Sequence, residues 1–189
     1  MSNILNDFSK KALTTPIKGN LFEYLEYLGG SPKAEFHQGP PLKWVFTGIP
    51  HSFLNNVLDT QLTAENVDEA IQQMLADCKS RNIPRISWWV EPGTRPADLG
   101  EHLAAHGLIY DDEEPGMAVD LLGLKEAATP TGLTIKPVEG VEMLRDFVRS
   151  AVSGYGMPEG SESTDTSLLN RLQTNSLEPS GMMARPVAV

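Results

Sequence analysis

The sequence has little cysteine and no long apolar run. Cys78 is the single cysteine, which excludes an intramolecular disulfide and leaves packing to stabilise the fold. A membrane-spanning helix needs about 20 consecutive apolar residues, and no stretch of the chain provides them. The first residues also lack the continuous apolar segment of a secretory signal. These absences predict a cytoplasmic protein with no membrane partner.

Basic residues are scarce as well. The chain carries 15 Lys and Arg residues against 25 Asp and Glu residues, for a formal net charge of −10. Such a surface repels phosphate backbones and anionic lipids, so we expect no nucleic-acid partner. The acidic run at 111–114 is interpreted as a solvated loop.

Complete catalytic motifs are missing too. The glycines at 154, 156 and 160 follow a predicted helix and have the wrong spacing for a dinucleotide-binding loop. His102 and His106 lie four residues apart, but no third ligand accompanies them, so we predict no metal site. The position of His106 in the last turn of a predicted helix suits the helix dipole instead. Cys78 lies on an apolar helix stripe, which predicts a buried, unreactive thiol.

The overall composition is typical of a packed globular protein, with 40% hydrophobic and 21% charged residues. A chain of 189 residues suits one domain and part of another. Residues 125–132 have the small and turn-forming residues of a linker. We therefore expect one module over 1–124 and the start of a second, incomplete module over 133–189.

Apolar periodicity predicts the elements of both modules. The clearest helix begins at Asn66, where Glu69 completes a capping box. The expected helices cover residues 21–28, 66–81, 96–107, 141–154 and 168–172. The expected strands cover residues 42–47, 56–60, 86–90, 117–122, 133–138 and 184–189. The adjacent Trp88 and Trp89 must face opposite sides of their strand, so one belongs to the core and the other can line a pocket.

Four segments resemble the first half of a tandem GNAT N-acetyltransferase. They are W-V-F-T-G-I-P-H-S-F-L-N-N-V-L (44–58), R-I-S-W-W-V-E-P-G-T-R-P-A-D-L (85–99), L-A-A-H-G-L and G-M-A-V-D-L. The resemblance covers residues 44–155. It implies an α/β (α+β) fold with a mixed, mostly antiparallel sheet flanked by helices, in which a degenerate module precedes one that binds acetyl-CoA. The implied activity is acyl transfer from acetyl-CoA to a small-molecule amine.

The chain departs from this family where the coenzyme would bind. The family holds the acetyl-CoA pyrophosphate with a glycine-containing R-x-x-G-x-G/A turn, whose backbone amides cap a helix. Residues 59–70 read D-T-Q-L-T-A-E-N-V-D-E-A, with no glycine, no arginine and four carboxylates that oppose a diphosphate. The tyrosine that many members use as a general acid would fall near Leu103, which has no proton to donate. We therefore predict no catalytic and no cofactor-binding residue, and weak or absent activity.

The residues that remain for binding are Trp44, Asn55 and Trp88, which we predict to line a substrate pocket. The coenzyme turn of the second module would lie beyond Val189, so the chain is expected to be a shortened relative of a two-module enzyme. An unpaired sheet edge near Val189 offers a surface to a second copy or another partner. The alternative function is a non-catalytic small-molecule-binding or protein-interaction module.

Overall fold

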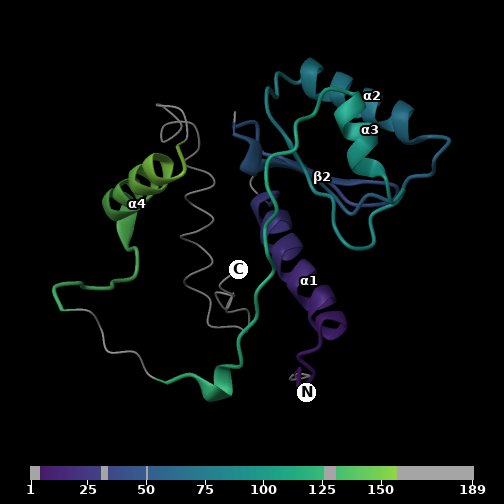
Figure 1. Cartoon of the computed structure of the whole chain (residues 1–189). Helices are drawn as coiled ribbons and strands as arrows, with labels where there is room; N and C mark the ends of the chain where they lie inside the picture. Colours follow the sequence, from purple (N-terminus) through teal and green to yellow (C-terminus); the bar gives the residue numbers. More distant parts are fainter. Residues whose placement is uncertain (1–4, 31–33, 50, 126–130, 157–189) are drawn as a thin grey trace.

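A four-stranded sheet forms the centre of the computed structural model, which describes residues 5–30, 34–49, 51–125 and 131–156 (Figure 1). Its strands, in their order across the sheet, are β1 (Glu35–His37), β2 (Lys43–Phe46), β3 (Asn55–Leu58) and β4 (Ser87–Trp88). β2 pairs antiparallel with β1 and β3, whereas β4 pairs parallel with β3. The predicted α/β class, with a mixed and mostly antiparallel sheet, is confirmed.

The helix α1 (Lys10–Leu28) begins well before the predicted helix at 21–28. Ser9 caps its first turn, where the hydroxyl accepts a backbone hydrogen bond at 3.3 Å. Pro16 and Gly19 lie inside the helix, and both residue types have low helix propensity. The sequence therefore indicated only the last two turns, where the apolar residues repeat at helical spacing.

Tertiary packing compensates for the weak propensity of α1. Figure 1 shows α1 on one side of the sheet and the two helices that follow β3 and β4 on the opposite side. Phe22 and Leu25 of α1 are 6% and 0% exposed. These two side chains belong to one apolar cluster. Its buried members are Phe22, Leu25, Ile49, Leu54 and Leu58. Burial of this stripe holds α1 against the sheet.

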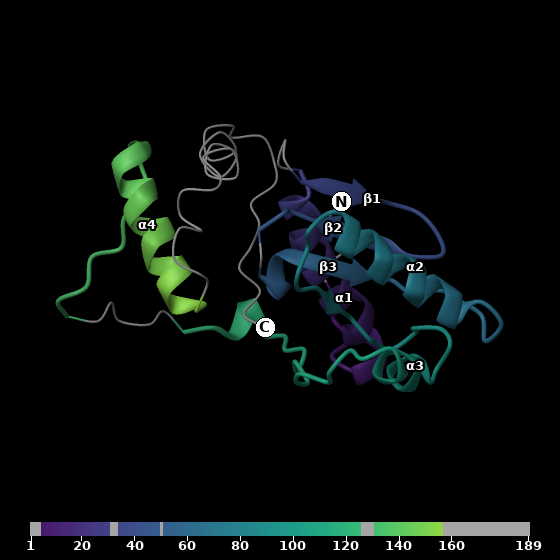
Figure 2. The ribbon, with the colours of Figure 1, turned by 90° about the horizontal axis from the view of Figure 1, so that it is seen from above.

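The opposite face of the sheet is covered by α2 (Val67–Ser80) and α3 (Leu99–Ala105), seen from above in Figure 2. The predicted inward stripe of α2 is confirmed, since it buries Val67, Ile71, Met74 and Cys78. Leu99 and Leu103 of α3 are buried as predicted. These helices share a core with β2 and β3 that also includes Leu42, Phe46, Val57, Leu62 and Ile83.

The capping box predicted for α2 is wrong. The side chain of Asn66 makes no capping hydrogen bond to the helix, and its Oδ1 accepts one from Thr63 N at 2.8 Å. Glu69 accepts from Gln73 Nε2 at 3.0 Å, one turn further along. The Asn66 side chain thus closes the turn that precedes the helix instead of capping the helix. Asparagine commonly forms such local hydrogen bonds with the backbone.

The two tryptophans face opposite sides of the sheet, as predicted. Trp88 packs against the core under α2 and α3, and Trp89 packs against the cluster under α1. Each indole N–H also donates a hydrogen bond to a polar side chain that lies on β3 or just after it. Trp88 Nε1 donates to Thr60 Oγ1 at 2.9 Å, and Trp89 Nε1 donates to Asn56 Oδ1 at 2.8 Å.

Three strand predictions differ from the structure. Residues 117–122 form no strand, and η2 (Leu121–Gly123) is a short 3-10 helix within this stretch. Residues 133–138 also form no strand and are exposed. The strand expected at 86–90 shortens to β4. Apolar alternation predicted these strands, but strands need a pairing neighbour, and the described residues place none beside 117–122 or 133–138.

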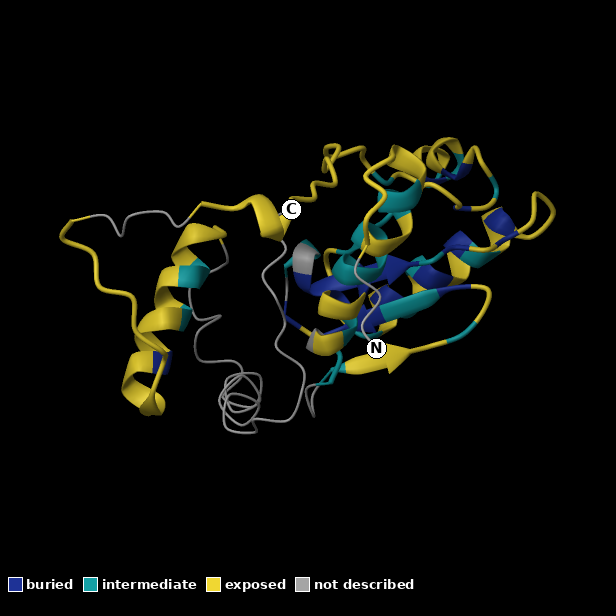
Figure 3. Ribbon diagram, turned by 90° about the horizontal axis from the view of Figure 1, so that it is seen from below, coloured by how far each residue is buried: buried dark blue, intermediate teal, exposed yellow. Residues whose placement is uncertain are grey.

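The helix α4 (Gly140–Gly154) confirms the prediction for 141–154. Figure 3 shows α4 mostly exposed and set apart from the sheet, where the buried residues gather. The predicted helix at 168–172, the strand at 184–189 and the sheet edge near Val189 lie outside the described residues. No helix within the described ranges is both long and apolar enough to span a membrane.

Replacement of Leu25 tests how far the packing of α1 stabilises the fold. We expect Leu25→Ala to lower the free energy of unfolding by about 2–5 kcal/mol, because it removes a buried side chain and leaves a cavity. Urea denaturation followed by circular dichroism measures the loss. The exposed neighbour Glu23 is the control, and Glu23→Ala should change the same quantity by about 0.5 kcal/mol or less. Equal losses in the two variants would contradict this packing.

Candidate functional site

The β3–α2 loop (residues 59–66) lies where the resemblance places the coenzyme turn, and its first residue is tied to two lysines. Asp59 Oδ1 is 3.1 Å from Lys18 Nζ, and Asp59 Oδ2 is 3.5 Å from Lys43 Nζ. Burial alone would raise the pKa of Asp59, but the two lysines outweigh it and hold the pKa below its ordinary value. Asp59 therefore places a fixed negative charge at the start of the loop.

Backbone amides along the β3–α2 loop and at the start of α2 donate hydrogen bonds within the chain. The donors are the N–H groups of Gln61, Leu62, Thr63, Asn66 and Val67. Two of them reach neighbouring segments, Pro41 O at 2.8 Å and Arg95 O at 3.0 Å. A bridge between Gln61 and Arg95 continues the parallel pairing of β3 and β4. An anion at a helix N-terminus needs N–H groups that are free to point at it.

Asp68 places a carboxylate of the chain itself in the first turn of α2. Asp68 Oδ1 is 3.0 Å from His102 Nδ1 and 3.0 Å from His106 Nε2, both on the segment of α3. These contacts lower the pKa of Asp68, and the same carboxylate raises the pKa of His102. His106 thus has a carboxylate partner as well as its place near the helix end. Among the described residues, no group of three or more His, Cys, Asp or Glu side chains is arranged to hold a metal ion.

Trp44 and Trp88 lie on one face of the sheet, on either side of Val57. The register pairs Trp44 with Val57 and Val57 with Trp88. The Trp44 ring stacks on Phe46, with 4.6 Å between the centroids, and the Arg81 guanidinium lies 5.0 Å from the Trp44 ring. The two tryptophans that were predicted to line a substrate pocket thus both have contacts within the chain.

Asn55 is fully buried at the start of β3. Its Oδ1 accepts from Thr47 N at 3.1 Å, and its Nδ2 donates to Ile49 O at 2.7 Å and His51 O at 3.0 Å. The side chain therefore supports the turn between β2 and β3. Its role in substrate binding, and that of Trp44 and Trp88, stays a prediction.

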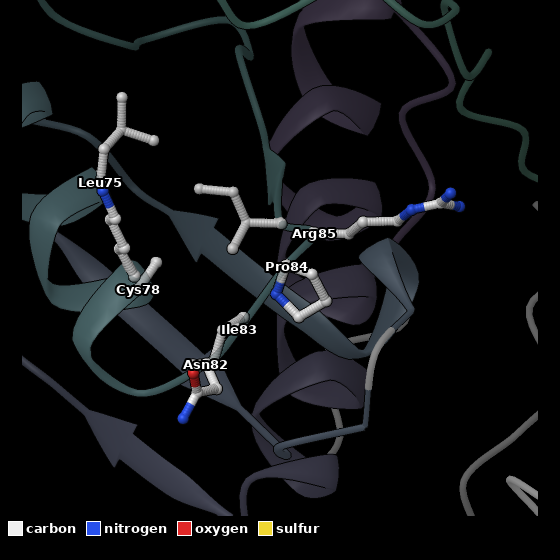
Figure 4. A pocket seen from close by; sticks show the side chains of 8 residues that line it. Leu75, Cys78, Asn82, Ile83, Pro84 and Arg85 are labelled. Atoms are coloured by element: carbon white, nitrogen blue, oxygen red, sulfur yellow. The ribbon is translucent and has the colours of Figure 1, made fainter.

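A hollow that the sequence did not indicate lies between the C-terminal end of α2 and the start of β4 (Figure 4). Its volume is about 600 Å³. Its wall combines the apolar Leu75 and Ile86 with the cationic Lys79 and Arg85. The hollow is open to solvent, so its lining does not by itself indicate a ligand. The lining residues come from one short stretch, and only their apolar stripe could be recognised in the sequence.

Cys78 lines this hollow and is buried. The residue is 4% exposed, and burial, assisted by the neighbouring Asp77, raises its pKa to about 11. A nucleophilic cysteine needs a low pKa, because the thiolate is the reactive form. The predicted burial of the thiol is confirmed, and its lack of reactivity stays a prediction.

Comparisons of the chain with protein-family models, curated protein sequences and solved structures give no significant match. Inferences about function therefore depend on the contacts described above.

Replacement of Asn55 distinguishes a structural role from a role in ligand binding alone. We expect Asn55→Ala to lower the free energy of unfolding by about 2–4 kcal/mol, because buried backbone groups of the β2–β3 turn lose their partner. Urea denaturation measures the change. Gln72→Ala, on the exposed face of α2, should change stability by about 0.5 kcal/mol or less. Unchanged stability of Asn55→Ala would contradict the structural role.

The contact between Asp68 and His102 should make stability depend on pH. The pKa of His102 in the folded state lies above its ordinary value of 6.5, so the protonated imidazole favours folding. The stabilisation is fully present below pH 6.5 and is lost as the pH rises through the folded-state pKa. We therefore expect His102→Gln to destabilise the protein more at about pH 5.5 than at about pH 8.5.

Urea denaturation of both proteins at the two pH values measures this difference. In the Asp68→Asn background, the effect of His102→Gln should depend less on pH, because the carboxylate that raises the pKa of His102 most is gone, while Asp98 remains 3.8 Å from His102 Nε2. If His102→Gln lowers the free energy of unfolding equally at both pH values in the wild-type background, the contact does not stabilise the protonated imidazole.

Proposed function

We propose that this chain is a GNAT N-acetyltransferase-like protein whose first module is a scaffold that does not bind acetyl-CoA. The order of elements supports the likeness, because β3 is followed by a helix, a tryptophan-containing strand and a short helix that ends before Gly107. The resemblance implies this order for the module. Transfer of an acetyl group to an amine is then weak or absent in this chain.

The engagement of the loop amides carries the second half of the proposal. Coenzyme diphosphates are bound by backbone N–H groups at a helix N-terminus, and here the N–H groups from Gln61 to Thr63 already donate within the chain. The carboxylates of Asp68 and Glu69 lie in the first turn of α2 and add repulsion. A chain with these features is suited to the alternative function, binding a small molecule or a protein without catalysis.

A titration of the full chain with acetyl-CoA tests the proposal. A ligand of the native state present at 100 times its Kd stabilises that state by about 2.7 kcal/mol, which raises the Tm by several degrees. We expect no rise with acetyl-CoA up to about 1 mM, measured by differential scanning fluorimetry. A rise that grows with acetyl-CoA concentration would refute the proposal.

The double variant Glu65→Ala and Glu69→Ala tests how far the charge of these two carboxylates contributes to exclusion, while Asp59 and Asp68 keep their charges. It removes two exposed carboxylates and leaves the backbone hydrogen bonds of the loop in place. If the engaged amides exclude the coenzyme, this variant also shows no rise in Tm. A rise confined to the variant would show that charge repulsion alone keeps acetyl-CoA out.

A further inference from the structure

The outer edge of β4 is not paired with another strand of the described chain. β4 is the last strand in the order across the sheet, and β3 is its only strand partner within the described ranges. Trp89 N–H donates to Val57 O at 3.0 Å, on the β3 side. Because successive residues of a strand alternate, the N–H and C=O groups of Trp88 point away from β3. An edge of this kind is a template for an added strand.

The hollow of Figure 4 adjoins this edge at the start of β4. Its lining includes Ile86, which directly precedes β4, and Leu75 of α2, and both pack partly buried against the core. The cations Lys79 and Arg85 belong to the same lining and are exposed. Neither forms an ion pair with another residue that the structure describes. The start of the edge is therefore apolar and positively charged.

Residues 111–120, which we call the 111–120 segment, have the pattern of a strand that lacks a partner. Met117 and Val119 are 50% and 58% exposed and lie at the period-two spacing of a strand. Leu121, the next residue at this spacing, is 53% exposed and begins η2. Four exposed carboxylates at 111–114 precede these apolar residues. Apolar side chains that alternate in this way are typical of a half-buried strand.

Gly116 packs closely against α1. A Cβ atom at position 116 would lie 2.7 Å from Ile17 Cγ2, so the chain crosses α1 at a contact that only glycine permits. α1 lies on the opposite side of the sheet from α2 and α3, and η2 lies beyond α1 and apart from the sheet (Figure 1). Residues 117–120 are therefore directed away from β4 of their own chain. This path favours β4 of a second copy as their partner.

We propose that two copies of this chain associate by exchanging the 111–120 segment, which adds to the outer edge of β4 of the other copy as a parallel strand. In the parallel direction, the carboxylates at 111–114 lie at the start of β4, beside Lys79 and Arg85. The apolar residues of the segment then follow along the edge. Each copy offers one edge and one segment, so a two-fold dimer satisfies both copies. The association needs neither acetyl-CoA nor an amine, so it goes beyond the proposed function.

Another exposed stretch with apolar alternation, residues 133–138, suits this edge less well. It carries Lys136, which would repel Lys79 and Arg85. Pro137 within it has no N–H to donate to a neighbouring strand. Charge and hydrogen bonding therefore both favour the 111–120 segment.

Size-exclusion chromatography with multi-angle light scattering tests the association of the full chain over a concentration series. We expect the mass to rise from 20.7 kDa to twice that value as the concentration increases. Val119→Pro should keep the mass of one copy, because proline removes a backbone N–H from the added strand. Val119 is exposed, so this replacement leaves the fold intact. The control Thr134→Pro, in the exposed 133–138 stretch, should associate like the wild type.

Three outcomes of this measurement would overturn the proposal. In the first, the wild-type chain keeps the mass of one copy at every concentration. In the second, Val119→Pro forms the dimer as well as the wild type does. In the third, Thr134→Pro loses the dimer and Val119→Pro retains it, which would assign the added strand to residues 133–138.

Charge exchange identifies the two surfaces that meet. The variant K79E/R85E makes the edge acidic, and the variant D112K/E113K/E114K makes the segment basic; all five residues are exposed. Each variant alone should keep the mass of one copy, because like charges then meet at the edge. An equimolar mixture should reach the doubled mass, because each copy now presents a charge opposite to that of the other. If the mixture stays at the mass of one copy, or if each variant alone associates like the wild type, these surfaces do not meet and the proposal is wrong.

Discussion

The fold depends on satisfying the polar groups of β3, the strand that is buried along its whole length. It carries Asn55 and Asn56, which are both 0% exposed, and Thr60 beyond its end is equally buried. Two adjacent tryptophans meet part of this demand from opposite faces, as Trp88 donates to Thr60 and Trp89 donates to Asn56. Large apolar rings with one N–H each can fill a core and satisfy an acceptor at the same time. The W-W pair is therefore a consequence of the polar central strand.

The pairing of β3 with β4 extends into the β3–α2 loop and engages part of its backbone. The backbone of the β3–α2 loop continues along the β4 side through Gln61 and Arg95, and the N–H groups of Gln61 and Leu62 donate to neighbouring segments. A loop built in this way is well supported by the neighbouring segments. Support of the central strand and binding of an anion thus compete for the same donors.

The sequence predicted the elements whose signal is local. The stripe of α2 and the inward leucines of α3 follow from helical spacing. Gly107 follows the end of α3 with a φ of +87°, a backbone conformation in which glycine commonly terminates helices. The sequence did not predict the start of α1, because its stability comes from contacts with distant residues. Contacts between residues that are distant in the sequence were not predicted either. Lys18 and Glu91 are far apart in the chain, and no spacing rule connects them.

Lys18 forms ion pairs with Asp59 and Glu91, and this cluster is difficult to explain by stability alone. Removing charged groups from water costs free energy, and well-packed apolar residues of similar volume often hold two elements together equally well or better. The described contacts of α1 with the sheet already include a buried apolar cluster, so α1 does not need Glu91 for its attachment.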